Sequence, residues 1–208
     1  MLQNCSIDPG TLDLLNSLMA FESLKNFSLV GGTNLALRFG HRLSVDIDLF
    51  SNQEFDNIEL ANLLKEKFQH LEFGNVLNKI GLFCYINSIK VDFVRHHYFN
   101  LIGDIEEIDG VRMFSLRDVA AMKIFAMLKR PRKKDHWDIA EILKYMSLEE
   151  MIDAYFQKYP DKIILISIPR ALTYTEDVED DIDPVSLNGT TWDDIKSFIA
   201  QKVEEFLR

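Results

Sequence analysis

The sequence predicts an α/β fold in which a small mixed β-sheet is followed by a lobe of helices. Two observations lead to this prediction. In the first half, short apolar runs alternate with polar residues, as in strands that bury one face. From Ser115 onward, apolar residues recur every three or four positions, as on one face of a helix. We therefore expect a sheet core in residues 1–112 and a helical lobe in residues 113–208 that packs against it.

Composition limits the class of protein. The 208 residues carry a net charge of −10 and contain no apolar run long enough to span a membrane. Two cysteines, Cys5 and Cys84, lie far apart without metal-ligand spacing, which is typical of thiols in a reducing compartment. The N-terminal residues lack the layout of a signal peptide, so we expect a cytoplasmic protein with no membrane partner. The acidic charge argues against a protein that coats nucleic acid, although it permits a local basic groove.

The first predicted elements surround a glycine turn. Apolar spacing from Asp8 to Leu24 predicts a helix that begins at Asp8-Pro9. An apolar run over Phe27–Val30 predicts the first strand, which breaks at Gly31-Gly32-Thr33 before a helix over Asn34–Phe39. Such a turn can bring backbone N–H groups and a hydroxyl against an anion at a helix N-terminus.

A second predicted strand, Val45–Phe50, carries two carboxylates. Asp46 and Asp48 would project to one face about 7 Å apart, with Val45, Ile47 and Leu49 on the other face. Two like charges so close repel each other and raise each other's pKa unless a cation lies between them. Oxygen ligands favour Mg²⁺ or Mn²⁺ over zinc. A phosphate cradle beside a carboxylate metal clamp indicates phosphoryl or nucleotidyl transfer.

A third carboxylate follows on another predicted strand. The intervening pattern predicts a helix over Asp56–His70, strands over Phe73–Ile80 and Leu82–Ile86, and a turn at Asn87-Ser88. Lys90 and Asp92 then share a face of a strand over Ile89–Val94. Asp92 could be a solvated surface charge, but with the upstream motifs we favour a third metal ligand for a two-metal site.

The second half predicts helices with one unusual lysine. Helices are expected from Ser115 to the basic run of residues 129–134, from Asp135 to Met146, from Ser147 to Tyr159, and, capped by Thr191, over Trp192–Leu207. Residues 162–175 fit a strand or a buried helix equally well. Lys123 has apolar neighbours on its helix face, so it must either reach solvent or meet a buried anion.

Two charged segments and one histidine pair are open to more than one interpretation. The basic run 129–134 could be a solvated turn or a contact surface for an RNA acceptor. The acidic residues 176–183 lack calcium-site spacing and predict a solvated loop, on which the basic run or a partner protein could dock. Adjacent residues point to opposite faces of a strand, so His96-His97 is not a metal pair.

The carboxylate and glycine motifs resemble a known superfamily. Gly31-Gly32-Thr33, with Asp46-Ile47-Asp48 beginning thirteen positions after Thr33, resembles the signature of DNA polymerase β-like nucleotidyltransferases. The fuller string GGTNLALRFGHRLSVDIDLF is similar to the AbiEii/AbiGii toxin family, whose hallmark is matched by His41-Arg42-Leu43-Ser44. Later matches are Lys123, Lys134-Asp135 and Asp138-Ile139, and the resemblance is good over residues 28–146.

The resemblance implies a function and its residues. It implies a nucleotidyltransferase core that moves a nucleoside monophosphate from an NTP to an acceptor hydroxyl with Mg²⁺ or Mn²⁺. Asp46 and Asp48 would bridge two metals, and Asp92 would bind the catalytic one. The nucleotide-binding residues would be Gly31, Gly32, Thr33, Arg42, Ser44, Lys123 and Asp135. By resemblance, the protein is the toxin of a type IV toxin–antitoxin or abortive-infection pair, with an RNA acceptor and a cognate antitoxin.

Two other functions remain possible at this stage. A nucleotidyltransferase for small aminoglycoside-like molecules would need a deep acidic pocket for its cationic acceptor. A non-catalytic nucleotide-binding or interaction module would have no need of Asp46, Asp48 and Asp92. Because repelling carboxylates cost stability without a metal, their presence argues against this second alternative.

Overall fold

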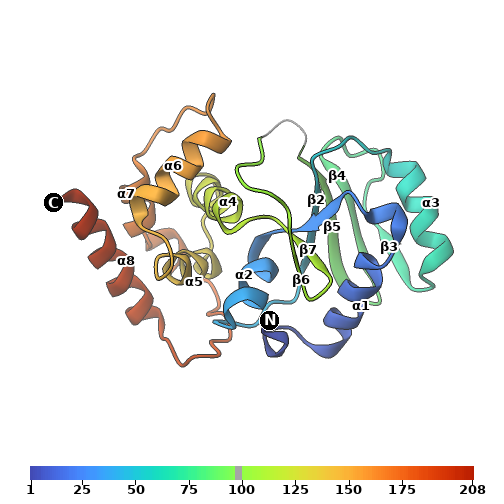
Figure 1. The fold of residues 1–208 in the computed structure, drawn as a ribbon. Helices are drawn as coiled ribbons and strands as arrows, with labels where there is room; N and C mark the ends of the chain where they lie inside the picture. The colour runs from blue at the N-terminus through green and yellow to red at the C-terminus, as the bar shows by residue number, and fades with distance from the viewer. Residues whose placement is uncertain (97–99) are drawn as a thin grey trace.

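The computed structural model describes residues 1–96 and 100–208 and has a mixed seven-stranded sheet in that part of the chain. The strand order is β3-β4-β5-β2-β1-β7-β6. The pairs β2·β5 and β1·β7 are parallel, and the other neighbours are antiparallel. In Figure 1 the sheet and the helices α1 and α3 occupy one half of the molecule, and α4 to α8 occupy the other, with α2 between them. The predicted α/β fold with a mixed sheet followed by helices is therefore confirmed. His97, half of the pair considered in the sequence, lies outside the described residues.

The first helix and strand form as predicted, with shifted ends. Helix α1 (Pro9–Met19) is capped by Asp8, whose Oδ1 accepts a hydrogen bond from the Thr11 amide at 3.0 Å. It ends at Met19, and a short 3-10 helix, Glu22–Leu24, leads to β1 (Phe27–Leu29). Helix α2 (Gly31–Phe39) begins at the first glycine rather than at Asn34. The glycine turn is therefore the first turn of the helix itself.

Strand β2 (Ile47–Ser51) is shorter at its start than predicted. Asp46 precedes the strand, and Val45 is 64% exposed, so the prediction that Val45 packs on the buried face was wrong. The backbone before β2 has other partners: the Leu43 amide donates to Val185 O, the Ser44 amide donates to Ser6 O, and the Thr33 hydroxyl donates to Asp46 O. These bonds hold the segment away from the sheet until Ile47.

The remaining sheet elements follow the predicted order with one error. Their bounds are α3 (Asn57–Lys67), β3 (Leu71–Phe73), β4 (Gly81–Ile86) and β5 (Ile89–Arg95). A strand over Phe73–Ile80 was wrong, because Asn57 Nδ2 donates to the Val76 and Asn78 carbonyls and holds that segment as a loop. The turn at Asn87-Ser88 is confirmed, with φ angles of 52° and 66°.

One hairpin of the sheet was not predicted from the sequence. It joins β6 (Glu106–Ile108) to β7 (Val111–Met113) through Asp109-Gly110, both at positive φ. Strands of three residues are too short to show alternation, but Asp-Gly is a hairpin signal in its own right. The hairpin completes the sheet, since β7 pairs with β1 at Leu29 and Met113.

The helical half agrees with prediction in most places. Its helices are α4 (Leu116–Lys129), α5 (Lys133–Ile142), α6 (Leu148–Lys158), α7 (Ile168–Thr173) and α8 (Trp192–Leu207). Side chains of Ser115, Ser147 and Thr191 cap three of them. Helix α5 starts and ends earlier than predicted. Neither alternative for residues 162–175 holds throughout, since α7 covers only its last part and Ile163 and Leu165 are 88% and 98% exposed.

Two hydrophobic clusters meet at α2. The sheet packs with α1 and α3 in one cluster, and α4 to α8 share the other. Leu37 belongs to the sheet cluster, whereas Leu35 of the same helix belongs to the helical cluster. The division at residues 112 and 113 stays a prediction, because α2 serves both sides. In the described residues, every helix is too short or too polar to cross a membrane.

Candidate active site

A cleft of about 610 Å³ lies where the sheet meets α4 and α5. Its walls come from the start of α2, from β2, β4 and β5, and from α4 and α5. Every residue assigned to catalysis or nucleotide binding in the sequence lines it, namely Gly31, Gly32, Thr33, Arg42, Ser44, Asp46, Asp48, Asp92, Lys123 and Asp135. The fold thus gathers residues that are up to about one hundred positions apart in the sequence.

The two glycines let charged side chains approach the first turn of α2. Gly31 has φ +71°, and a Cβ there would collide with the Asp48 carboxylate. A Cβ on Gly32 would collide with the Arg42 guanidinium. The first N–H groups of a helix have no partner within the helix, so this end offers donors to an anion in the cleft.

Thr33 and Ser44 hold the segment that carries Asp46. The hydroxyls of Thr33 and Ser44 lie 2.8 Å apart, both side chains are buried, and Thr33 also donates to the Asp46 carbonyl. The Thr33 hydroxyl therefore has protein partners, although the sequence suggested an anion for it. Its position fixes the start of β2 against α2.

Asp48 and Asp92 are directly paired neighbours on the parallel strands β2 and β5. Burial, with the charges of Asp92 and Asp46, raises the pKa of Asp48 to about 6, against the opposing effect of Lys90 and Lys123. Lys90 Nζ donates to Asp92 Oδ2 at 2.5 Å, and Lys134 Nζ lies 3.6 Å from Asp46 Oδ2. The carboxylates thus lie together, with lysines at two of them.

The carboxylate group fits a divalent cation. Among the described residues, no hydrogen-bond partner reaches the buried Oδ1 of Asp92. This oxygen and the raised pKa of Asp48 both fit a cation bound between the two strands, and carboxylate oxygens suit Mg²⁺ or Mn²⁺. In residues 1–96 and 100–208, no three acidic, His or Cys side chains already converge into a metal-binding group.

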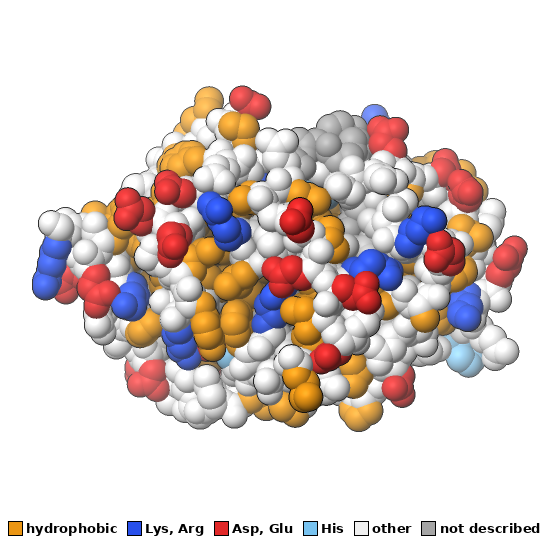
Figure 2. Space-filling model, in the orientation of Figure 1, with side chains coloured by type: hydrophobic (Ala, Val, Ile, Leu, Met, Phe, Trp, Pro, Cys, Tyr) orange, Lys and Arg blue, Asp and Glu red, His pale blue; other side chains and the backbone are white. Residues whose placement is uncertain are grey.

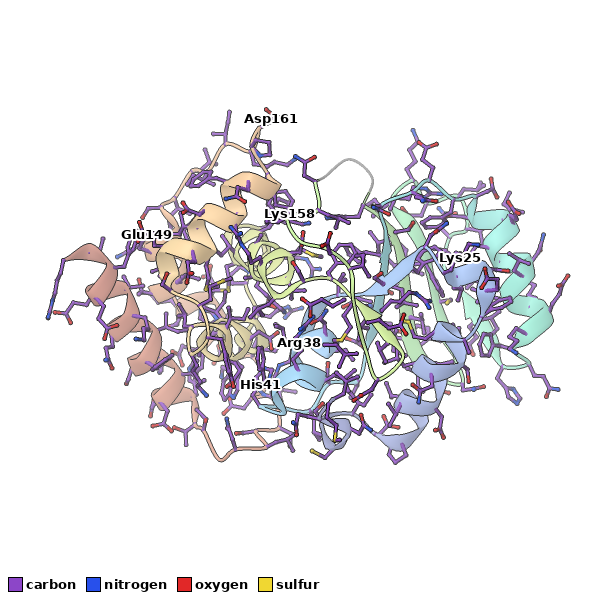
Figure 3. All side chains as sticks on the ribbon, viewed as in Figure 1. Lys25, Arg38, His41, Glu149, Lys158 and Asp161 are labelled. Carbon is purple, nitrogen blue, oxygen red and sulfur yellow. The ribbon has the colours of Figure 1, made fainter. Side chains whose placement is uncertain are left out.

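Asp138 of α5 was missed as a site residue. Its fully buried carboxylate accepts hydrogen bonds from Arg42 Nε and Nη2, both at 2.8 Å, and lies 2.8 Å from His41 Nε2 and 2.6 Å from Lys123 Nζ. Burial alone would raise the pKa of Asp138, but these cations and the His41 hydrogen bond hold it well below its usual range. Figure 3 labels His41 close to α2.

Lys123 meets buried anions, which was one of its two predicted environments. Its Nζ also donates to Asp135 Oδ1 at 2.7 Å. Burial opposes the charge, but Asp138 and Asp135 together raise the pKa of Lys123. A signal for Asp138 was present, since an acidic residue on the apolar side of α5 needs a cation and Lys123 on the preceding helix needs an anion.

A basic rim borders the cleft. Arg130, Arg132 and Lys134 line it, and the acidic segment 176–183 docks beside them through an ion pair of 3.1 Å between Arg132 and Asp181. Lys133 Nζ lies 3.0 Å from Asp183 Oδ1. Most acidic side chains of this segment are exposed, as a solvated loop predicts, and the basic run docks on it, which the sequence had left open. Acidic and basic side chains are interspersed over the face in Figure 2, so the net negative charge does not form one continuous field there.

Apolar side chains from both the strands and α4 also line the cleft. They are Phe50, Phe83, Val94, Val119, Met122, Phe125 and Ala126. Sequence patterns show these residues only as core positions of strands and helices. A cleft that combines apolar side chains with a charged centre can accept a ligand with one apolar part and one anionic part.

Comparison with known proteins identifies the family. The sequence model described as nucleotidyl transferase AbiEii toxin, type IV TA system, matches residues 13–205. An uncharacterized protein of Aquifex aeolicus (strain VF5) is 27% identical over 203 residues, which are 94% of this chain and 95% of that protein. A crystal structure from H. pylori, assigned as a nucleotidyltransferase, superposes with a TM-score of 0.61 at 13% identity, covering 97% of this chain and 99% of that one. The Helicobacter pylori protein JHP933 superposes with a TM-score of 0.51 at 12% identity, covering 97% of each chain.

At such identities the two structures support the fold, and the family follows from the sequence match. Since that match runs through the glycine turn, the paired carboxylates and the Lys123–Asp138 pair, the chain belongs to the nucleotidyl transferase AbiEii toxin family and is a nucleotidyltransferase.

Proposed function

We propose that the protein transfers a nucleoside monophosphate from an NTP to a hydroxyl of an RNA acceptor, releases pyrophosphate and requires Mg²⁺ or Mn²⁺. The observation that carries this proposal is the pairing of Asp48 with Asp92 on adjacent parallel strands, directly beside the open first turn of α2. Carboxylates that bind a cation thereby lie next to backbone donors that bind phosphate. Phosphoryl transfer needs this positioning and charge neutralisation more than it needs covalent help from the protein.

The metal site would be formed by Asp46, Asp48 and Asp92. When bound, Mg²⁺ neutralises charge between these carboxylates and the triphosphate oxygens and favours loss of the proton from the attacking hydroxyl. Asp48 and Asp92 are held by their strands, whereas Asp46 lies on the segment fixed by Thr33 and Ser44. Thr33 and Ser44 are therefore proposed to act through the placement of Asp46.

The triphosphate would bind across the start of α2. The backbone N–H groups of Gly31 and Gly32 would donate to phosphate oxygens, as is typical of helix N-termini. An ammonium has three N–H donors, and contacts with Asp135 and Asp138 occupy two of those of Lys123. Its third donor would bind a phosphate oxygen. Arg42, held by Asp138 beneath Gly32, would add positive charge to the same end of the cleft.

The rim favours an anionic acceptor. Arg130 and Lys134 lie at the cleft with Arg132, and this basic border suits the phosphates of RNA rather than a cationic aminoglycoside. The family description supports a role as the toxin of a type IV toxin–antitoxin pair. We therefore propose that a cognate antitoxin binds the protein and that the protein acts in the cytoplasm.

The test is incubation with each labelled NTP in turn, Mg²⁺ and total RNA. We expect the wild type to label RNA and the Asp46→Ala/Asp48→Ala double variant to leave it unlabelled. Asp13→Ala is the matched control, because Asp13 is an exposed carboxylate on α1. Label in small hydroxylated molecules but not in RNA would show that the acceptor is a small molecule rather than RNA. Failure of the wild type to bind any NTP with Mg²⁺ or Mn²⁺ would contradict the enzymatic proposal.

A further inference from the structure

Lys90 lies among the carboxylates of the cleft, and the proposed transfer reaction gives it no role. It stands two residues before Asp92 on β5, so both side chains project from the same face of the strand into the cleft. Its ammonium donates to Asp92 Oδ2 at 2.5 Å. The Lys90 side chain is 39% exposed, against 14% for Asp92. A long side chain thus reaches from the cleft surface to a mostly buried carboxylate.

This ammonium contacts Oδ2 of the carboxylate whose other oxygen, Oδ1, has no partner and would take the cation. Asp92 is paired in register with Asp48, so a cation shared by the two would bind next to the Lys90 ammonium. The contact of Lys134 with Asp46 is longer, 3.6 Å, and comes from a side chain that is 52% exposed. Of these two lysines, Lys90 therefore holds its carboxylate more firmly.

We propose that Lys90 is a resident counter-cation that competes with free divalent metal for Asp92 and yields only to metal that arrives with a nucleoside triphosphate. This inference rests on the proposed metal and nucleotide site. A divalent ion and an ammonium on the same carboxylate repel each other, and the repulsion is stronger in a partly buried site than in water. A bound triphosphate reverses this effect, because its oxygens give the displaced ammonium new partners.

Binding of metal and of nucleotide is consequently coupled. Free metal binds weakly, since it must either stand beside the Lys90 ammonium or displace it into water without compensation. Metal and triphosphate together bind well, and each raises the affinity of the other by the same factor. Removing the charge of Lys90 should therefore strengthen the binding of metal alone and weaken the coupling. A residue that merely packs against the strand would affect neither quantity.

The experiment is titration of Mn²⁺ into the protein, followed by electron paramagnetic resonance of the free ion, with and without a non-hydrolysable NTP analogue. Lys90→Met keeps the bulk of the side chain and removes its charge. We expect it to bind free Mn²⁺ at least about tenfold more tightly than the wild type, in line with the repulsion removed. Lys90→Arg should stay within about threefold of the wild type, because it keeps the charge. Lys65→Met, on the exposed face of α3, is the matched control and should leave Mn²⁺ affinity unchanged.

With the NTP analogue present, Lys90→Met should no longer bind Mn²⁺ more tightly than the wild type, since the wild-type ammonium then binds the triphosphate. If Lys90→Met binds free Mn²⁺ no more tightly than the wild type, the inference about Lys90 is overturned while the metal site stands. If the wild type and Lys90→Met both fail to bind Mn²⁺, with and without nucleotide, the proposed metal site fails and the inference fails with it. Lys90→Gln serves the same comparison should Lys90→Met not fold.

Discussion

Asp138 balances the charges buried between α2, α4 and α5. Its fully buried carboxylate accepts a hydrogen bond from Arg42 and contacts His41 and Lys123. Asp138→Asn keeps the shape but leaves the Arg42 and Lys123 cations without their shared anion, a change that costs about 3 kcal/mol or more in buried ion pairs. Guanidinium unfolding at neutral pH should show this loss in the free energy of unfolding. The exposed Asp13→Asn should cost almost nothing, and equal stability of the two variants would contradict the assigned role of Asp138.

The difference between Asp138 and Asp92 explains which site residues the sequence could predict. Asp92 and Lys90 share a strand face, which alternation alone indicates, and the strand pairing brings Asp92 beside Asp48. The partners of Asp138 are about 96 positions away at Arg42, and their approach depends on how α5 packs against α2. Local patterns contain no information on that packing. The sequence therefore predicted residues of the cleft without predicting which of their side chains contact one another.

His96 should make stability fall in mild acid. Burial lowers the pKa of His96 to about 3, with Lys158 acting in the same direction, whereas an unfolded histidine has a pKa of about 6.5. The unfolded state then binds more protons between these values, so stability is full above pH 6.5 and falls as the pH decreases, by up to about 1.4 kcal/mol per pH unit. His96→Phe, which suits the neighbouring rings of Phe50 and Phe114, should flatten this slope between about pH 6.5 and pH 4.5.

The measurement is urea unfolding of both proteins over that pH range. Asp48 acts in the opposite direction, because its raised pKa makes the folded state take up a proton below about pH 6. The slopes of the two proteins must therefore be compared with each other. Parallel slopes would show that His96 does not stay neutral in the folded state.

At the scale of elements, the acidic segment 176–183 shields the basic start of α5. Asp181 pairs with Arg132 at 3.1 Å, and the Arg132 side chain is 60% exposed at the cleft rim. Asp181→Asn should free Arg132 and raise the affinity for RNA about two- to fivefold at low salt, the range of an exposed ion pair. Fluorescence anisotropy with a labelled RNA oligonucleotide measures this affinity, and added salt should reduce the difference. Asp177→Asn, in the same segment but bonded to Tyr174, is the control. Weaker binding by Asp181→Asn would exclude the shielding role.

Elements with local start signals were predictable, and elements defined by distant partners were not. Asp8, Ser115 and Thr191 each begin a helix through a side-chain oxygen that accepts a hydrogen bond from a backbone N–H three residues later. By contrast, β6 and β7 are three residues each, and β7 is placed by pairing with β1. The apolar residues 163–166 looked like a strand or buried helix, but no neighbouring element in the described residues covers Ile163 or Leu165. The residues of this segment alone do not show whether another element packs against them.

At the scale of the whole molecule, the segments that build the sheet and the helices of the second half are joined in two places. Helix α2 contributes Leu35 to one cluster and Leu37 to the other. A buried network adds a second link: Asp118 of α4 accepts from the Ile102 and Gly103 amides and from Lys158 of α6, with both ionic side chains fully buried. The label of Lys158 in Figure 3 marks this junction on the helical side. The sequence predicted a sheet and a helical lobe, but it held no signal for these connections, because they join residues far apart in the chain.

These links predict that the two clusters unfold together. Trp137 and Trp192 both lie in the helical cluster, so their fluorescence reports on that half. Cys84 is buried in the sheet cluster, and burial raises the pKa of its thiol to about 12, so its reaction with a thiol reagent reports on the other half. In a Cys5→Ser background, the two probes should show the same denaturant midpoint. Lys158→Met leaves the Asp118 carboxylate buried without its cation and should lower stability by about 3 kcal/mol, with both midpoints shifting equally. If fluorescence changes at a lower denaturant concentration than that at which Cys84 becomes reactive, the helices unfold as a separate unit, and the division at residues 112 and 113 describes two domains rather than two regions of one cooperative fold.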